Sequence, residues 1–268
     1  MAEIRNVVFD VGNVLIGFRS MDMLRDHGLD EEQSREFARC IFLDPLWKEF
    51  DLENMPFEEV VQTYMRKYPR LAADVRWLMD HCEQMAVPRP DVWEKVHALK
   101  EAGYRLYILS NYSSVFFRKH TQGAPFFEDM DGKVISCELH VIKPDEGIYR
   151  CLLEKYDLKA EECIFFDDLA DNVETALRLG MQSVRIRSKE QLTAVSPISD
   201  NSMSRFSFCR SFGTVFPFST CWGWSSNSRT QGCKPFSRWA AAAASTCRCA
   251  RWSPSKKPRA TAVPVLLV

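Results

Sequence analysis

FDVGNVL, residues 9–15, ends the first apolar run of the chain and places one aspartate, Asp10, directly behind it. Residues 4–9 are rich in apolar, β-branched side chains, and Gly12 ends the run, so a short buried strand is predicted there. An aspartate in this position favours an Asx turn or a helix cap. It also stands where α/β proteins collect catalytic side chains. The later strands help to choose between these interpretations.

Two further apolar runs end in polar residues in the same way. Residues 104–109 (YRLYIL) lead into Ser110 and Asn111, and residues 163–166 (CIFF) lead into the pair Asp167–Asp168. Ser-Asn is a common turn sequence and means little alone. Two adjacent carboxylates, by contrast, repel each other unless a cation or a hydrogen-bond donor lies beside them.

Strands and helices alternate along the rest of this region. Short strands are predicted at residues 134–139 and 183–186, with helical spacing ahead of the later strands. Fully apolar strands that alternate with helices are typical of a parallel sheet covered on both faces. We therefore expect an α/β fold with a Rossmann-like parallel sheet, whose carboxyl ends gather the polar residues.

The segment after the first strand is long and helical. Apolar residues in 57–65 recur at i, i+3, i+4, i+7 and i+8, which is the stripe of an amphipathic helix. We predict a small helical cap at residues 18–87, inserted after the first strand. The core domain is then residues 1–17 and 88–198.

The cap is expected to select the substrate. Trp47 and Phe50 precede a charged turn at residues 51–53. Their expected role is packing between the cap helices, and stacking on a sugar is the alternative.

Charge is distributed unevenly between two parts of the chain. Residues 1–198 hold 25 Lys and Arg against 35 Asp and Glu, whereas residues 199–268 hold 10 against one. The acidic part argues against nucleic acid as its partner. No apolar stretch of about 18 residues predicts a membrane span. No signal-peptide pattern opens the chain, and scattered cysteines indicate reduced thiols, so a cytoplasmic location is predicted.

Residues 199–268 differ from the rest in composition. They hold five of the ten cysteines and four of the seven tryptophans, and no strand or helix period persists. We predict a disordered tail, whose composition is typical of out-of-frame translation after a disrupted gene end. A basic, aromatic nucleic-acid arm and a metal site at residues 247–249 are the alternatives.

Lys143 completes a set of groups that suits phosphoryl transfer. It stands before Pro144, at the start of a predicted helix, where a solvated lysine is the ordinary interpretation. A carboxylate can act as a nucleophile, and Mg²⁺ takes hard oxygen ligands. Hydroxyl, amide and ammonium donors can stabilise the remaining phosphate charge. The strand ends and Lys143 together supply all of these groups.

Order and spacing of these motifs resemble the haloacid dehalogenase (HAD) superfamily. FDVGNVL, ILSN, VIKPDEGIY and IFFDDLADN match its four motifs in order, over roughly residues 4–187. The D-x-G-N-V and DD-x-A-D-N patterns resemble a bacterial branch of subfamily IA that includes α-D-glucose-1-phosphate phosphatases. The resemblance implies a Mg²⁺-dependent phosphatase of a small phosphorylated metabolite, such as a sugar phosphate, with an aspartyl-phosphate intermediate.

The same resemblance implies a metal site. Asp10 would be both nucleophile and Mg²⁺ ligand, together with the backbone carbonyl of Gly12 and the carboxylate of Asp168. Asp167 and Asn172 would support that site.

It also implies a phosphate site beside the metal. Ser110 and Asn111 would bind the phosphate. Lys143 would neutralise both the phosphate and the nucleophile.

Gly12 departs from the family pattern. Most phosphatases of the superfamily carry there an aspartate that protonates the leaving group and then activates water, and such help is worth about 10²–10⁴-fold. An anomeric phosphate needs less help, and Asp145, His120 or a cap residue are candidates to replace the acid. Gly12→Asp is expected to have a mild or positive effect on substrates with poor leaving groups, unless the glycine makes room for another group.

Two other functions stay open at this point. Metal-free dehalogenases of the superfamily also lack an aspartate at this position, but their chemistry does not need the pair Asp167–Asp168. A phosphate-binding protein that has lost turnover through Gly12 would keep the pocket. The sequence makes no prediction of the oligomeric state.

Overall fold

The computed structural model describes residues 2–193. Its strands are β1 (Asn6–Phe9), β2 (Ile16–Phe18), β3 (Ala86–Pro88), β4 (Arg105–Ser110), β5 (Gly132–Ile135), β6 (Cys163–Asp167) and β7 (Gln182–Arg185). Its α-helices are α1 (Ser20–Asp26), α2 (Glu31–Ile41), α3 (Trp47–Leu52), α4 (Phe57–Lys67), α5 (Ala72–Asp80), α6 (Pro90–Glu101), α7 (Ser114–His120), α8 (Ser136–Leu139), α9 (Glu146–Lys155), α10 (Ala170–Arg178) and α11 (Lys189–Thr193). None of these helices is both long and apolar enough to cross a membrane. The predicted tail, residues 199–268, lies outside the described residues.

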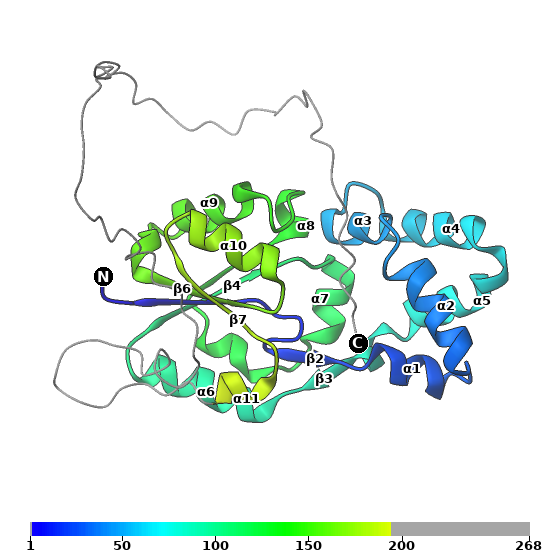
Figure 1. Cartoon of the computed structure of the whole chain (residues 1–268), viewed down its shortest axis with the longest axis horizontal. Helices are drawn as coiled ribbons and strands as arrows, with labels where there is room; N and C mark the ends of the chain where they lie inside the picture. The colour runs from blue at the N-terminus through cyan, green and yellow to red at the C-terminus, as the bar shows by residue number, and fades with distance from the viewer. Residues whose placement is uncertain (1, 194–268) are drawn as a thin grey trace, which may run out of the picture. The chain divides into compact units, whose positions relative to one another are not determined.

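Five strands form one parallel sheet in the order β5-β4-β1-β6-β7 (Figure 1). β1 is the central strand and is buried along its whole length. Phe9 of β1 pairs with Ile108 of β4 on one side and with Phe166 of β6 on the other. The residues that follow in each strand therefore meet at one carboxyl edge, as the α/β prediction requires.

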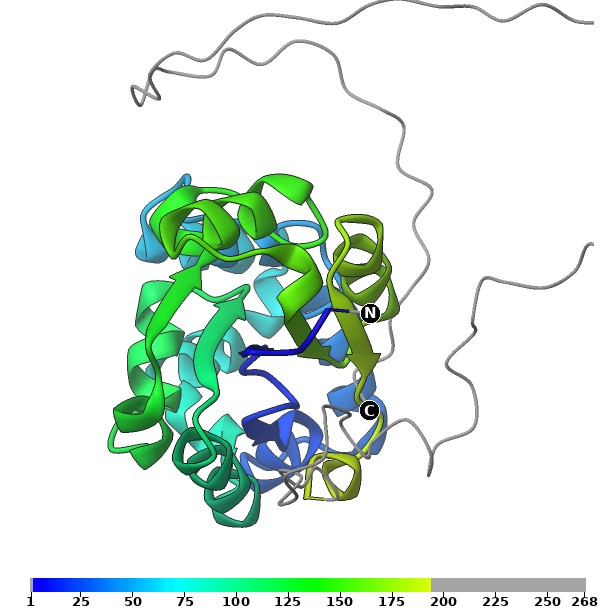
Figure 2. The ribbon, with the colours of Figure 1, turned by 90° about the vertical axis from the view of Figure 1, so that its left-hand side faces the viewer.

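Helices cover both faces of this sheet (Figure 2). Successive side chains of a strand point to opposite faces. Val7 accordingly joins a buried cluster with Val96 of α6, whereas Val8 joins a second cluster with Ile148 of α9. Burying each such side chain stabilises the fold by roughly 1.5–3 kcal/mol. The predicted Rossmann-like sheet is confirmed.

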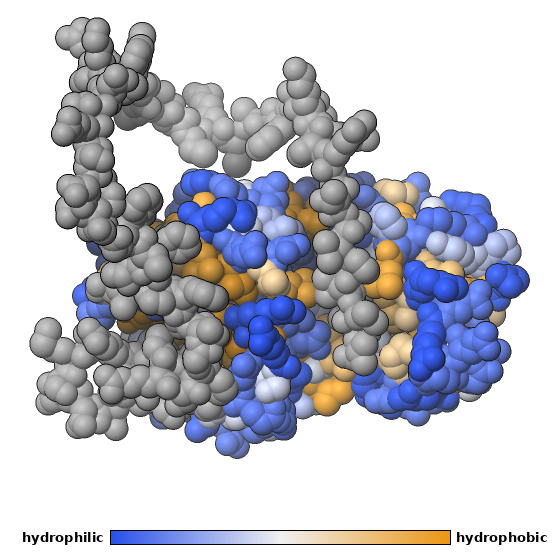
Figure 3. All heavy atoms as spheres, viewed as in Figure 1, coloured by the Kyte–Doolittle hydropathy of each residue, from blue (hydrophilic) through white to orange (hydrophobic). Residues whose placement is uncertain are grey.

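Helices α1 to α5 are inserted between β2 and β3, which pair antiparallel beside the main sheet (Figure 1). α2 begins with a capping box, in which Asp30 Oδ1 accepts from Gln33 N and Gln33 Oε1 accepts from Asp30 N, each at 2.8 Å. The surface around α2 and α5 is mainly hydrophilic (Figure 3). We propose that this insertion is the cap predicted at residues 18–87.

Trp47 and Phe50 pack where α3 meets α7. Phe50 lies against Tyr64 of α4, with ring centroids 6.0 Å apart, so packing between helices of the insertion is confirmed. Both rings also contact Phe116 of α7, at centroid distances of 5.7 Å for Trp47 and 5.4 Å for Phe50. These aromatic rings therefore join the insertion to the sheet domain.

The strand predicted at residues 134–139 is wrong beyond Ile135. β5 pairs with β4 only as far as the pair Ser110 and Ile135, and the chain then turns into the short helix α8. Ser136 causes the change, because its Oγ accepts from the Tyr112 amide at 2.9 Å and donates to the Asp51 carbonyl at 2.6 Å. These bonds tie Ser136 to two other segments and stop the strand.

Candidate active site

Asp10 lies directly after β1, at the carboxyl edge of the sheet. Its amide donates to the Phe166 carbonyl at 2.9 Å, which extends the pairing of β1 with β6 by one residue. The side chain is buried, and its Oδ1 accepts from Ser110 Oγ at 2.6 Å and from Lys143 Nζ at 2.8 Å. Among residues 2–193, none donates a hydrogen bond to Oδ2. One oxygen of Asp10 is thus held in place while the other stays available.

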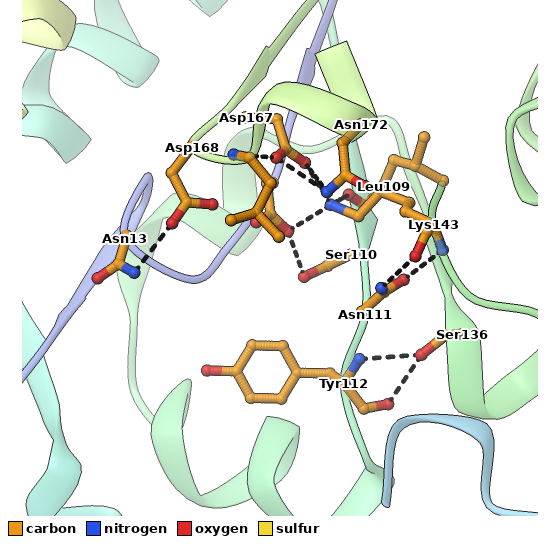
Figure 4. Close-up of polar contacts among 12 residues, drawn as sticks. Asn13, Leu109, Ser110, Asn111, Tyr112, Ser136, Lys143, Asp167, Asp168 and Asn172 are labelled. Atoms are coloured by element: carbon orange, nitrogen blue, oxygen red, sulfur yellow. Dashed lines mark hydrogen bonds and ion pairs between the residues drawn. The ribbon is translucent and has the colours of Figure 1, made fainter. Parts of the chain in front are cut away.

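Lys143 is a buried cation and not the solvated lysine that its sequence context alone would suggest. Its Nζ bonds to Asp167 Oδ2 at 2.6 Å and to the Leu109 carbonyl at 3.0 Å, besides Asp10 (Figure 4). Burial lowers the pKa of Lys143, but the charges of Asp10 and Asp167 outweigh burial and raise this pKa above its usual value. Lys143 therefore stays protonated between the two carboxylates.

Asn111 holds the backbone of Lys143. Its Oδ1 accepts from the Lys143 amide at 2.7 Å, and its Nδ2 donates to the Lys143 carbonyl at 3.0 Å (Figure 4). Both polar groups of this side chain are thus engaged. The contacts suit a positioning role, and phosphate binding by Asn111 stays a prediction.

Asp167 ends β6 and is completely buried. Its Oδ1 accepts from the Leu169 amide at 2.8 Å, and Asn172 Nδ2 donates to both carboxylate oxygens at 2.9 and 3.0 Å. With Lys143 on Oδ2, these donors satisfy most of its acceptor capacity. Asp167 and Asn172 accordingly form a rigid support beside Lys143 (Figure 4).

Asp168 faces Asn13 across the site (Figure 4). Asn13 Nδ2 donates to Asp168 Oδ2 at 3.0 Å. Asn13 has a φ of 54°, in the left-handed region that asparagine tolerates better than most residues. Our sequence analysis gave Asn13 no role, although it lies within FDVGNVL. Its place in the D-x-G-N-V pattern, three residues before β2, was the signal for it.

Three carboxylates lie close together, and the charge of Lys143 alone does not balance their negative charge. One oxygen each from Asp10, Asp167 and Asp168 lie within 4.8 Å of one another. Burial raises the pKa of Asp10 to about 7, against the charge of Lys143, and Asp167 and Asp168 add to the rise. Burial and the charge of Asp167 likewise raise the pKa of Asp168. The set fits Mg²⁺, which prefers a few hard oxygen ligands, and a divalent cation would remove the imbalance.

Phe18 fills the space beside Gly12. A Cβ added to Gly12 would lie 2.9 Å from Phe18 Cε2, closer than carbon atoms can approach. The ring is itself packed against Tyr112 and His120, with centroid distances of 6.4 and 5.6 Å. Gly12 therefore makes room for an aromatic ring. The mild or positive effect of Gly12→Asp was expected only if the glycine did not make room for another group, so that expectation no longer holds.

We now expect Gly12→Asp to destabilise the protein, because the new Cβ forces the Phe18 ring to move. Overpacking of this kind costs about 1–3 kcal/mol. Gly12→Ala, which adds the Cβ without a carboxylate, should show a similar loss in denaturant unfolding. Adding Phe18→Leu should recover stability in both variants. Unchanged unfolding of both single variants would contradict this role of Phe18.

Two candidates for the missing acid are engaged elsewhere. His120 Nε2 donates to the Cys82 carbonyl at 2.8 Å, and its Nδ1 accepts from the Tyr112 hydroxyl at 3.0 Å. Burial lowers the pKa of His120, which favours the neutral ring over the imidazolium form that a general acid needs. Asp145 is exposed and caps α9, where its Oδ1 accepts from the Gly147 amide at 2.7 Å.

Comparison with known proteins agrees with this geometry. The model of the haloacid dehalogenase-like hydrolase family matches residues 4–180. Phosphatase MT3486 of Mycobacterium tuberculosis (strain CDC 1551 / Oshkosh) is 27% identical over 189 residues, which are 68% of this chain and 86% of that protein. Drimenol cyclase drtB of Aspergillus calidoustus is 23% identical over 70% of this chain, which spans only 35% of the cyclase.

A solved structure shares the fold. The HAD family enzyme bt-2542 of Bacteroides thetaiotaomicron, in complex with magnesium and inorganic phosphate, superposes with a TM-score of 0.58. The two are 19% identical, over 69% of this chain and 95% of that enzyme. The family model, the parallel sheet and the residues at the strand ends agree. The chain therefore belongs to the haloacid dehalogenase-like hydrolases.

Proposed function

We propose that this hydrolase is a Mg²⁺-dependent phosphatase that acts on a small phosphorylated metabolite. One observation carries the proposal: three carboxylates lie within 4.8 Å of one another beside a single buried ammonium group. The reaction of a metal-free dehalogenase does not need this concentration of negative charge. The phosphatase among the relatives and the magnesium and phosphate in the bt-2542 structure support the same function.

Asp10 and Asp168 would hold the ion, because Asp167 is already occupied by Lys143 and Asn172. The Gly12 carbonyl is the third ligand that we propose. When bound, Mg²⁺ supplies positive charge that offsets the charge of a phosphoryl group.

The nucleophile in this proposal is the carboxylate of Asp10. Ser110 and Lys143 fix its Oδ1, and the second oxygen attacks phosphorus to give an aspartyl-phosphate. Because the Ser110 hydroxyl and the Lys143 ammonium group contact Asp10, they are also the donors that would stabilise negative charge on the transferred phosphoryl group. Water then attacks the phosphorus atom and releases Asp10.

The substrate that we propose is a sugar phosphate, of which glucose 1-phosphate is the first to test. Its anomeric oxygen leaves more easily than the oxygen of an ordinary alcohol, which suits a site with glycine at position 12. Turnover of other small phosphate esters instead would still support the phosphatase function and would change only the proposed substrate.

Removal of the metal should abolish turnover. Without the added positive charge, the carboxylates repel both one another and a phosphoryl group. Hydrolysis of 4-nitrophenyl phosphate and glucose 1-phosphate should therefore fall to background after EDTA treatment and return when Mg²⁺ is added in excess. Turnover that persists in EDTA would contradict the proposal, and phosphate binding without any turnover would favour the non-catalytic alternative.

A further inference from the structure

A phosphate ester with a poor leaving group needs a proton donor that position 12 does not supply. With Gly12 covered by Phe18, and with His120 and Asp145 engaged, a residue of the insertion is the candidate left from the sequence analysis. Asp51, near the end of α3 in the insertion, carries a carboxyl group whose pKa is affected by the charges of Asp10 and Lys143.

Hydrogen bonds fix residues 51–53 onto the sheet domain. The Asp51 carbonyl accepts from Ser136 Oγ at 2.6 Å, and the Leu52 carbonyl accepts from His140 Nδ1 at 2.7 Å. Glu53 Oε1 accepts from the Ser114 amide at 2.7 Å, and its backbone has a φ of 47°. Three consecutive residues are thus tied to α7, to α8 and to the residue after α8.

These bonds place Asp51 at the catalytic edge of the sheet. Ser136 follows Ile135, which pairs with Ser110, the residue that donates to Asp10. The Ser136 hydroxyl therefore links the backbone of Asp51 to the carboxyl edge of the sheet, where Ser110 contacts Asp10.

The Asp51 carboxyl group is set apart from the metal ligands. It does not belong to the trio of close carboxylates, and within the described part of the chain it makes neither a hydrogen bond nor an ion pair. Its side chain is half-buried, so solvent reaches it only in part. A carboxyl group that feels the charge of Asp10, but lies outside the metal cluster, is a candidate to serve the leaving oxygen of a bound phosphate ester.

Burial, more than the surrounding charges, favours the neutral form of Asp51. Burial raises its pKa to about 7, the charge of Asp10 adds to the rise, and the charge of Lys143 opposes it. Tyr112 lies in the field of both Asp10 and Asp51, and burial and these two charges raise its pKa. Burial is the largest cause of the raised pKa of Asp51, and it does not depend on whether a metal is bound.

We propose, on the basis of the phosphatase function above, that Asp51 is the general acid that protonates the leaving oxygen. As a carboxylate oxygen of Asp10 bonds to phosphorus, the ester bond from phosphorus to oxygen breaks, and that oxygen takes the proton of Asp51. The products are the free alcohol, the aspartyl-phosphate and the Asp51 carboxylate. Asp51 recovers its proton from the water that attacks phosphorus when the Asp10 carboxylate leaves.

Two substrates of nearly equal shape test this role. Phenyl phosphate has a poor leaving group that needs a proton, whereas 4-nitrophenyl phosphate has a good one that does not. Asp51→Asn should lower kcat/KM for phenyl phosphate by about 100-fold and for 4-nitrophenyl phosphate by less than about 3-fold. The ratio kcat/KM covers only steps up to loss of the leaving alcohol, so hydrolysis of the aspartyl-phosphate does not affect it.

Glu49→Gln is the matched control, because it replaces a carboxyl group of α3 by a carboxamide about one half-turn earlier and should change neither value. Asp51→Ala should repeat the substrate-dependent loss, which shows that the new carboxamide is not its cause. An equal loss on both substrates, or no loss on phenyl phosphate, would overturn the role of Asp51. A wild-type protein that hydrolyses neither ester with Mg²⁺ would instead overturn the phosphatase function itself.

Discussion

Asp10→Asn is expected to abolish phosphate release while the protein keeps its fold. A carboxamide cannot form the aspartyl-phosphate, and loss of a catalytic nucleophile removes at least about 10⁴-fold of the rate. Asparagine matches aspartate in size, so it fits between Ser110 and Lys143 without a steric clash. The measurement is phosphate release with Mg²⁺, together with circular dichroism and thermal unfolding.

A control for Asp10→Asn is available on the surface. Asp145→Asn removes one carboxylate beyond the same edge of the sheet, and asparagine caps a helix as well as aspartate does. We expect this variant to keep full activity and stability. Substantial turnover by Asp10→Asn would remove Asp10 as the nucleophile, whatever the result for Asp145.

Lys143→Met is expected to damage both stability and activity. It deletes the buried ammonium group that pairs with Asp10 at 2.8 Å and with Asp167 at 2.6 Å. Both carboxylates then lose their cationic partner. Breaking a buried ion pair from one side costs about 3–5 kcal/mol. Loss of one donor to the developing phosphoryl charge lowers kcat by about 10²–10³-fold. Denaturant unfolding and steady-state kinetics measure the two effects.

Lys133→Met serves as the control for the loss of a lysine. Lys133 pairs with Glu138 at the surface, and exposed pairs of this kind contribute about 0–1 kcal/mol. Added Mg²⁺ should return part of the stability lost in Lys143→Met, because it restores positive charge near the carboxylates. If Lys143→Met unfolds at the same denaturant concentration as wild type, Lys143 does not hold the site together.

The sequence was sufficient to predict the sheet and most of the residues that meet at its edge. Asp10, Ser110 and Asp167 follow apolar strands, and parallel strands bring their carboxyl ends to one side. Lys143 was harder to judge, because only the tertiary structure shows that its ammonium group is buried between two carboxylates.

Other parts of the site depend on contacts that no local pattern carries. Phe18 and Gly12 are six residues apart, and only the return of β2 beside the loop brings the ring against the glycine. Residues 51–53 are held on the sheet domain by bonds to segments more than 60 residues away. The strand predicted past Ile135 failed for the same reason, since the bonds of Ser136 to distant residues overrode a strand-like sequence.

Trapping the covalent intermediate is the most direct test of the central claim, that Asp10 attacks phosphorus. Enzyme quenched in acid during turnover in ¹⁸O water would be digested and analysed by mass spectrometry. The account predicts a phosphoryl group on the peptide that contains Asp10, and ¹⁸O in the released phosphate but not in the Asp10 carboxylate. A peptide without the phosphoryl group, or ¹⁸O incorporated into Asp10 itself, would contradict it.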